Sequence, residues 1–311
     1  MNIQEGLNDL LEAGRREGVF PSAAAWVCQD HRSQWSAYVG DGQPGTLWDV
    51  ASLTKPMVVV SECMTQVAQG AVNLDGPIEI APGRRVAIRD LLAHRSGLPA
   101  WVDLHGFMNA NFESWTPGTA KTREAVREHI AELAPGDGAE VSTVYSDLGF
   151  ILLGWFLESQ TGKSLRQLGR GTYGDLSPPK DKTPYVPTGR CPERGVELLG
   201  QVNDLNCWVL GGAEGHAGLF ATLDEVARWA ASLARAYDGL GSEWDPGVVA
   251  EFWAPHNRIS EATWVLGWDT PSPQGSSAGT RVSSSAVGHL GFTGTSVWLD
   301  LEQGLSVVLL T

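Results

Sequence analysis

The chain has 311 residues, which is enough for one large domain or two interleaved ones with a sizeable buried core. Hydrophobic residues make up 42% and charged residues 19%, with 37 glycines and 17 prolines, which excludes a disordered or fibrous protein and indicates a loop-rich globular one. The formal net charge of −14, without any run of five Lys or Arg residues, argues against nucleic acid and anionic membrane surfaces as partners.

The first twenty residues, MNIQEGLNDLLEAGRREGVF, predict an amphipathic helix. A signal peptide would have a basic start and a continuous apolar core, and this segment has neither. We therefore expect a cytoplasmic protein on the sequence given, or a periplasmic or secreted one if a leader has been removed. No apolar run in the sequence is long enough to span a membrane.

The predicted elements form a strand-rich start, a helical middle and a strand-rich end. Extended segments are predicted at 21–30, 33–42 and 46–52. A mostly buried helix follows from Lys55 to Gln69 and is closed by Gly70. Further helices are predicted at 88–93, 122–133, 147–160 and 223–237, and the strand pattern returns at 264–269, 288–300 and 304–310. One sheet built from both ends of the chain, with a helical region inserted, fits this order.

Cysteines and histidines give no sign of a metal centre. The cysteines are scattered without a CxxC pair, which predicts buried free thiols at Cys28, Cys63, Cys191 and Cys207. The seven histidines form neither HExxH nor HxHxDH. We expect no metal and no cofactor.

A serine three residues before a lysine, at the start of an apolar helix, is the first candidate for chemistry. A serine hydroxyl is a poor nucleophile until a base takes its proton, and a lysine one helical turn away can do so. At a helix N-terminus the helix dipole favours developing negative charge, and burial is expected to lower the pKa of the lysine toward that of a base. Ser52 and Lys55, in SLTK, fit this description, although a plain helix cap at Ser52 explains the same spacing.

Two other serines compete with Ser52. Ser177 and Lys180 repeat the spacing in SPPK, but two prolines separate them and no apolar helix follows. Ser277 lies in GSSAG, which matches the GxSxG pentapeptide of the α/β-hydrolases. A nucleophile elbow requires a hydrophobic strand before this pentapeptide and a helix after it, and the sequence has neither. We expect both segments to be loops.

Two later motifs lie where they could serve the same site. Tyr145 and Asp147, in YSD, directly precede an apolar helix, so that the phenol could share a proton with a lysine at the mouth of that helix. His289 and Gly291, in GHLGFTGTS, open a glycine-rich strand on which a peptide N–H could face a substrate carbonyl. Taken singly, each motif also has a structural explanation as aromatic packing, a helix cap or an edge strand.

Together the three motifs, in this order, resemble the penicillin-recognising serine hydrolases. The family pattern is SxxK, then YxN or a variant, then KTG or HxG, and this chain has SLTK, YSD and HLG. The branch that contains class C β-lactamases, DD-peptidases, D-aminopeptidases and lactamase-like esterases is also similar at LLAHRSGLPAW (91–101), GGAEGHAGLFAT (211–222) and GHLGFTGTSVWLD (288–300). The resemblance runs from about Phe20 to the end of the chain.

The resemblance implies a β-lactamase/transpeptidase-like α+β fold, in which an antiparallel sheet is flanked by helices and carries an inserted, mainly helical region. We expect residues 1–50 and 211–311 to form the sheet domain and residues 51–210 to form the helical domain, with the active site at their junction. The family usually adds a C-terminal helix after the last strand, so the sequence leaves open whether the chain continues beyond Thr311.

The resemblance also implies the roles of individual residues. Ser52 would be the acylated nucleophile, Lys55 its proton acceptor, and Tyr145 the general base and acid that protonates the leaving group. The backbone N–H groups of Ser52 and Phe292 would form the oxyanion hole. The residues expected to contact the substrate are Asp147, His289 and Gly291.

Two positions depart from the lactamase pattern. Asp147 stands where an asparagine is usual, and a carboxylate cannot donate a hydrogen bond to an amide unless it is protonated. His289 replaces the KTG lysine, and a histidine is only partly protonated at neutral pH, which weakens its hold on a substrate carboxylate. Both changes favour an esterase or DD-peptidase-like enzyme, with weak or no β-lactamase activity, acting on a small ester, amide or D-amino-acid peptide.

A catalytically silent protein of the same fold, which binds or senses a ligand in the pocket, is the alternative. The intact SLTK and YSD motifs argue against it. Among the 13 tryptophans, Trp101, Trp115 and Trp208 could line an apolar pocket, although packing explains most tryptophans more simply. The sequence leaves the substrate and the oligomeric state open.

Overall fold

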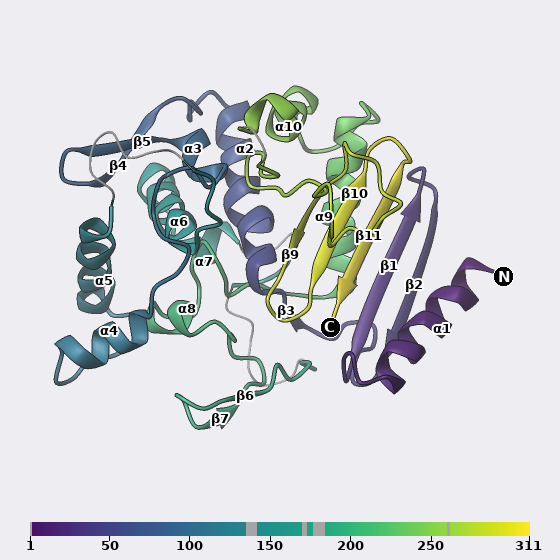
Figure 1. Cartoon of the computed structure of the whole chain (residues 1–311), viewed down its shortest axis with the longest axis horizontal. Coiled ribbons are helices and arrows are strands. Elements are labelled where there is room, and N and C mark those ends of the chain that lie inside the picture. The colour runs from purple at the N-terminus through teal and green to yellow at the C-terminus, as the bar shows by residue number, and fades with distance from the viewer. Residues whose placement is uncertain (1, 135–141, 170–172, 177–183, 260–261) are drawn as a thin grey trace.

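A five-stranded antiparallel sheet built from both ends of the chain organises the fold (Figure 1). The computed structural model describes residues 2–134, 142–169, 173–176, 184–259 and 262–311. The strand order is β2-β1-β11-β10-β9, so the last strand of the chain lies between its first and the preceding hairpin. The bounds are β1 (Ala23–Gln29), β2 (Ser33–Val39), β9 (Val287–Leu290), β10 (Ser296–Asp300) and β11 (Leu305–Leu310).

Helices cover both faces of the sheet, because side chains alternate along each strand. On one face Ala23 and Ala25 of β1 pack with Leu11 of α1 (Ile3–Arg16). On the other face Ala24 and Trp26 belong to the main core. There α9 (Leu223–Tyr237) contacts β1, β10 and β11.

The remaining helices lie mostly between β2 and β9 in the sequence. They are α2 (Ser61–Ala68), α3 (Ile88–Leu92), α4 (Leu104–Asn111), α5 (Ala120–Glu132), α6 (Asp147–Thr161), α7 (Leu165–Leu168), α8 (Leu205–Val209) and α10 (Pro246–Trp253), with 3-10 turns at Ala51–Leu53 and Pro255–Asn257 and a π-helical segment at Lys55–Val60. Three two-stranded sheets pair β3 (Trp48–Asp49) with β8 (Phe220–Ala221), β4 (Pro77–Ala81) with β5 (Arg84–Ala87), and β6 (Arg190–Cys191) with β7 (Val196–Glu197).

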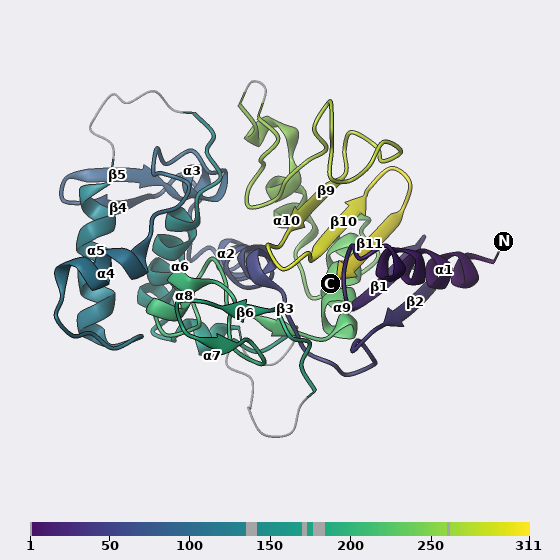
Figure 2. The same ribbon diagram turned by 60° about the horizontal axis from the view of Figure 1, so that its bottom comes forward.

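The segment from residue 51 to residue 68 lies between the sheet and the inserted helices, in both views (Figures 1 and 2). Its 3-10 turn contacts β9 of the sheet, and its π-helical part contacts α6 of the insertion. All six residues of the π-helical part are buried, including Lys55. The segment that carries SLTK therefore joins the two regions.

Helix α6 shows why the sequence pattern predicts this insertion well. Ser146 caps the helix by accepting a hydrogen bond from the Gly149 N–H, and Gly162 ends it in the left-handed conformation at φ 67°. Nearly every residue from Leu148 to Leu157 is buried. The cap fixes the position of Tyr145 and Asp147, which flank Ser146.

The structure confirms the α+β fold class, the long helices and the buried free cysteines. Two strand predictions near the C-terminus are wrong. Residues 264–269 form no strand and contribute only a single bridge between Asp269 and Gly288, and residues 288–300 form the hairpin β9–β10 instead of one strand. The division into domains at residues 50 and 210 stays a prediction.

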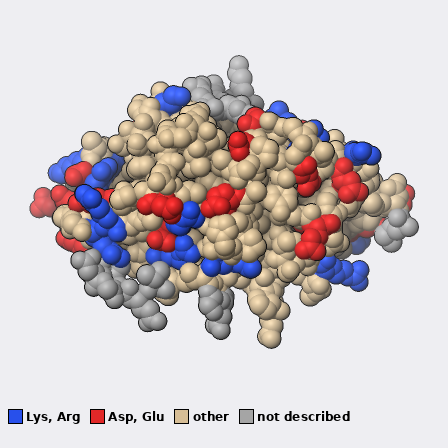
Figure 3. Space-filling model, turned by 90° about the horizontal axis from the view of Figure 1, so that it is seen from above, with Lys and Arg blue, Asp and Glu red and all other residues tan. Residues whose placement is uncertain are grey.

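The charges of the surface are mixed where Figure 3 shows them, since acidic and basic side chains alternate across this face. Among the described residues, no helix is long and apolar enough to cross a membrane.

Gly267 provides a test of how tightly the π-helical segment is packed. Its N–H donates to the Leu92 carbonyl, its φ is +79°, and an added Cβ would lie 2.2 Å from Val60 Cγ2. Gly275 has a φ of +65° but open space around the same position. We expect Gly267→Ala to lower the free energy of unfolding by about 1–3 kcal/mol more than Gly275→Ala, because only the first overpacks the core. Denaturant unfolding of both variants measures the difference, and equal losses would contradict the packing argument.

Candidate active site

The backbone in front of Ser52 is held in a strained conformation. Ala51 has a φ of +47°, which is unusual for a residue with a side chain. Its N–H donates to Asp49 Oδ1 (2.9 Å), and its carbonyl accepts from Thr54 Oγ1 (2.6 Å). Burial raises the pKa of Asp49 to about 6, so this carboxylate is mainly ionised at neutral pH and holds the turn through backbone hydrogen bonds.

The β9–β10 turn is tied to the same piece of backbone. Thr295 Oγ1 donates to the Val50 carbonyl (3.0 Å), and Thr293 Oγ1 donates to the Asp49 carbonyl (2.7 Å). At Gly291 an added Cβ would lie 2.6 Å from the Val50 oxygen, so only glycine permits this approach. The turn that carries Phe292 is therefore held against the start of the SLTK segment.

Lys55 is completely buried and surrounded by acceptors. Its Nζ lies 3.0 Å from Ser52 Oγ, 3.2 Å from the His216 carbonyl oxygen and 2.7 Å from Asp147 Oδ1. An ammonium group has three N–H bonds, and these three acceptors match them. Asp147 was expected to contact the substrate, but in the structure its Oδ1 is paired with Lys55.

The resting charge of Lys55 differs from the sequence-based expectation. Burial alone lowers the pKa of Lys55, but Tyr145 and the Asp147 carboxylate oppose it and raise the pKa above the usual lysine value. Lys55 is therefore an ammonium at neutral pH. The prediction that burial turns Lys55 into a ready base is wrong, because the sequence did not show that the Asp147 carboxylate contacts its Nζ.

Tyr145 lies beside the ammonium group, with its ring centroid 4.8 Å from Lys55 Nζ. Burial raises the pKa of the phenol, while the Lys55 charge and hydrogen bonds to Lys55 and Ser52 oppose this rise. The phenol is thus neutral in the resting site, within hydrogen-bonding contact of both the serine and the lysine. Tyr145 also packs against Trp264 and His94, with ring centroids 5.0 Å and 4.7 Å away.

His289 is buried at the inner end of β9 and is uncharged. Burial, followed by the charge of Lys55, lowers its pKa to about 3. Its Nδ1 lies 2.7 Å from the Leu290 carbonyl oxygen, which can only accept, so Nδ1 carries the proton. The sequence suggested partial protonation at neutral pH, and the structure shows a neutral imidazole.

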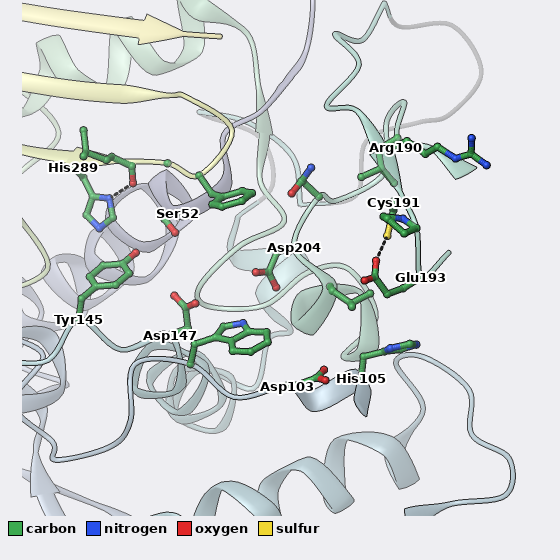
Figure 4. A pocket seen from close by; sticks show the side chains of 18 of the residues that line it. Ser52, Asp103, His105, Tyr145, Asp147, Arg190, Cys191, Glu193, Asp204 and His289 are labelled. Atoms are coloured by element: carbon green, nitrogen blue, oxygen red, sulfur yellow. Dashed lines mark hydrogen bonds between the residues drawn. The ribbon is translucent and has the colours of Figure 1, made fainter. Parts of the chain in front are cut away.

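The predicted site residues surround one cavity of about 1030 Å³. Its lining includes Ser52, Tyr145, Asp147, His289, Gly291 and Phe292, and Lys55 lies beneath Ser52. Figure 4 shows Ser52, Tyr145 and His289 together at one end, while Asp103, His105 and Glu193 lie at the other. Since Ser52 and Phe292 line the same cavity, their backbone N–H groups remain the proposed oxyanion hole.

The competing serines lie elsewhere or are not described. Ser277 is exposed in a loop without a preceding strand or following helix, so the structure does not support a nucleophile elbow there. Ser177 and Lys180 lie outside the described residues.

Sequence reasoning missed a second ion pair in the site. His216 Nε2 lies 2.9 Å from Asp204 Oδ1, and the His216 carbonyl is one of the three acceptors of Lys55. Burial alone would lower the pKa of His216, but Asp204 outweighs it and raises that pKa. The only signal in the sequence was the GHAG segment around His216, whose partner twelve residues earlier no motif marks. In the described part of the chain, no group of three or more His, Cys, Asp or Glu side chains could hold a metal ion.

Comparison with known proteins agrees with this geometry. The sequence model of the family described as Beta-lactamase matches residues 7–311. N-acetylmuramyl-L-alanine amidase of Bacillus subtilis (strain 168) is 26% identical over 311 residues, which cover 86% of this chain and 68% of that protein.

Two solved structures are similar over almost the whole chain. The octameric penicillin-binding protein homologue from Pyrococcus abyssi has a TM-score of 0.73 at 18% identity, covering 100% of this chain and 73% of that one. EstCE1, a hydrolase with promiscuous acyltransferase activity, has a TM-score of 0.72 at 17% identity, covering 99% and 92%. These likenesses show the β-lactamase/transpeptidase-like fold. With the family match over nearly all its length, the chain belongs to the β-lactamase family of serine hydrolases.

Proposed function

We propose that the protein hydrolyses a small ester, amide or D-amino-acid peptide through an acyl-enzyme on Ser52. The observation that carries the proposal is the 3.0 Å contact between Ser52 Oγ and the buried Lys55 Nζ, at the end of a large cavity. The amidase from Bacillus subtilis and the hydrolase EstCE1 support this reaction class, since both names describe acyl transfer from amides or to acceptors.

The site must lose one proton before it can act as a base. A protonated Lys55 has no lone pair, and the resting phenol of Tyr145 is neutral. Loss of one proton gives either a neutral Lys55 or a Tyr145 phenolate beside the Lys55 ammonium, and the two groups titrate as one system. We assign the active form of the enzyme to this deprotonated pair.

In the proposed reaction Ser52 Oγ bonds to the substrate carbonyl carbon while its proton passes to the Lys55–Tyr145 pair. The N–H groups of Ser52 and Phe292 stabilise the negative oxygen that forms. The pair then gives the proton to the leaving oxygen or nitrogen as its bond to carbon breaks. Water, deprotonated by the same pair, hydrolyses the acyl-enzyme.

A neutral His289 supports an ester or amide substrate over a β-lactam. In place of the cation that could hold a substrate carboxylate, β9 presents an uncharged imidazole with a pKa of about 3. The nearest cation, Lys55, is already paired with Asp147. A carboxylate-bearing substrate therefore finds little compensation for its desolvation here.

Replacement of the nucleophile tests the proposal directly. We expect Ser52→Ala to lower the hydrolysis of p-nitrophenyl acetate by at least roughly a thousandfold, because no acyl-enzyme can form. It should also abolish labelling by a fluorescent fluorophosphonate, as seen by gel fluorescence and intact mass. Ser277→Ala is the matched control and should retain both. Labelling that persists in Ser52→Ala and disappears in Ser277→Ala would overturn the assignment, and a wild type that neither hydrolyses nor reacts would favour the silent ligand-binding alternative.

The pH dependence tests the role of Asp147. Its negative charge raises the pKa of both Lys55 and Tyr145, so its removal should let the pair lose its proton at lower pH. We expect Asp147→Asn to move the acidic limb of kcat/KM for a neutral ester toward acid by roughly one pH unit or more. Glu128→Gln, which removes an exposed negative charge on α5, should leave the profile in place. An unshifted or alkaline-shifted limb in Asp147→Asn would show that Asp147 does not set the charge of the pair.

A further inference from the structure

The imidazole of His289 leaves one buried acceptor without a partner. Nδ1 donates to the Leu290 carbonyl, so Nε2 carries a lone pair. Within the described chain Nε2 has no hydrogen-bond partner, although the residue is only 1% exposed and lines the cavity. A buried polar atom without a partner calls for a ligand group that completes it, and a lone pair can only be completed by a donor.

The charges of the cavity point in the same direction. Its lining carries the carboxylates of Asp103, Asp147, Glu193, Asp204 and Asp269. Two of them already have a cationic partner, since Asp147 pairs with Lys55 and Asp204 with His216. The remaining cation of the lining, Arg190, is exposed and extends away from the other labelled side chains (Figure 4).

Two of the uncompensated carboxylates lie at the far end from Ser52. Asp103 is exposed and accepts a hydrogen bond from the Gly106 N–H at the start of α4, and Glu193 is exposed with only a thiol contact to Cys191 at 3.4 Å. Between the two ends, the exposed aromatic rings of Trp101 (52%) and Phe292 (88%) line the cavity. Aromatic faces beside carboxylates attract ammonium groups, both by the ring quadrupole and by charge.

We propose that the cavity selects acyl substrates that carry an ammonium group and rejects those that carry a carboxylate. His289 Nε2 accepts a hydrogen bond from a donor close to the scissile carbonyl, and Asp103 with Glu193 attracts a cation at the end of a longer acyl chain. This inference rests on the proposed function of Ser52 and adds to it the charge of the substrate.

A series of p-nitrophenyl esters separates charge from shape. Each acyl chain ends in an ammonium, a methyl or a carboxylate group, and the series is made with a short and a long chain. At low ionic strength we expect kcat/KM to fall roughly tenfold from ammonium to methyl and again from methyl to carboxylate, and added salt should narrow both ratios. Equal values, or a preference for the carboxylate ester, would overturn the proposal while the methyl ester still shows turnover by Ser52.

Variants assign the selectivity to its residues. Asp103→Asn combined with Glu193→Gln should lose the ammonium preference for the long chain, and asparagine keeps the helix cap at residue 103. His289→Lys should reverse the preference for the short chain, because it places a cation where a lone pair stood. Glu128→Gln is the matched charge control and should keep all ratios. Ratios that survive in both cavity variants would locate the selectivity elsewhere and overturn the assignment.

A binding measurement keeps the inference separate from catalysis. Calorimetric titration of Ser52→Ala with butylammonium, butanol and butyrate should show the tightest binding for butylammonium. If the wild type neither hydrolyses the methyl ester nor is labelled, the proposed function fails, and this titration still decides the substrate charge. Butyrate binding as tightly as butylammonium would overturn the inference even if the hydrolase is active.

Discussion

The buried ammonium group of Lys55 is the constraint on which the site depends. A charge taken out of water needs acceptors on every N–H bond, since an isolated buried ion is strongly destabilising. Here the acceptors come from three distant parts of the chain: the Ser52 hydroxyl, the Asp147 carboxylate and the His216 carbonyl. The sheet region, the inserted helix α6 and the loop before β8 must therefore all be in place before Lys55 can be buried.

This dependence explains which parts of the molecule the sequence could predict. The SLTK spacing and the capped helix α6 are local patterns, so both were recognisable without a structure, and the order of SLTK, YSD and HLG identified the fold class. The α10 helix had a usable signal that was not exploited, an aspartate cap at Asp245 followed by Pro246. By contrast, residues 264–269 look like a strand in isolation, and only the tertiary structure limits them to one bridge with Gly288.

The electrostatics of the site could not be predicted, because they depend on contacts between residues far apart in sequence. No pattern shows that Asp147 meets Lys55, and that contact reverses the expected direction of the lysine pKa. Nor does any pattern show that the imidazole of His289 donates to its own neighbour's carbonyl, which fixes where its lone pair lies. The residue types at these positions were visible from the start, but their charge states come from the three-dimensional arrangement.

The threonine hydroxyls of the β9–β10 turn have a consequence for how the proposed oxyanion hole is formed. Because Thr293 and Thr295 bond to the carbonyls of Asp49 and Val50, the spacing between the two amide donors is set when the chain folds. Substrate binding then requires little ordering of the backbone, so the entropy lost in aligning the donors belongs to folding and not to each turnover. A site of this kind works as a rigid template at the reacting carbonyl, and any adaptation to substrates of different length falls to the open end of the cavity.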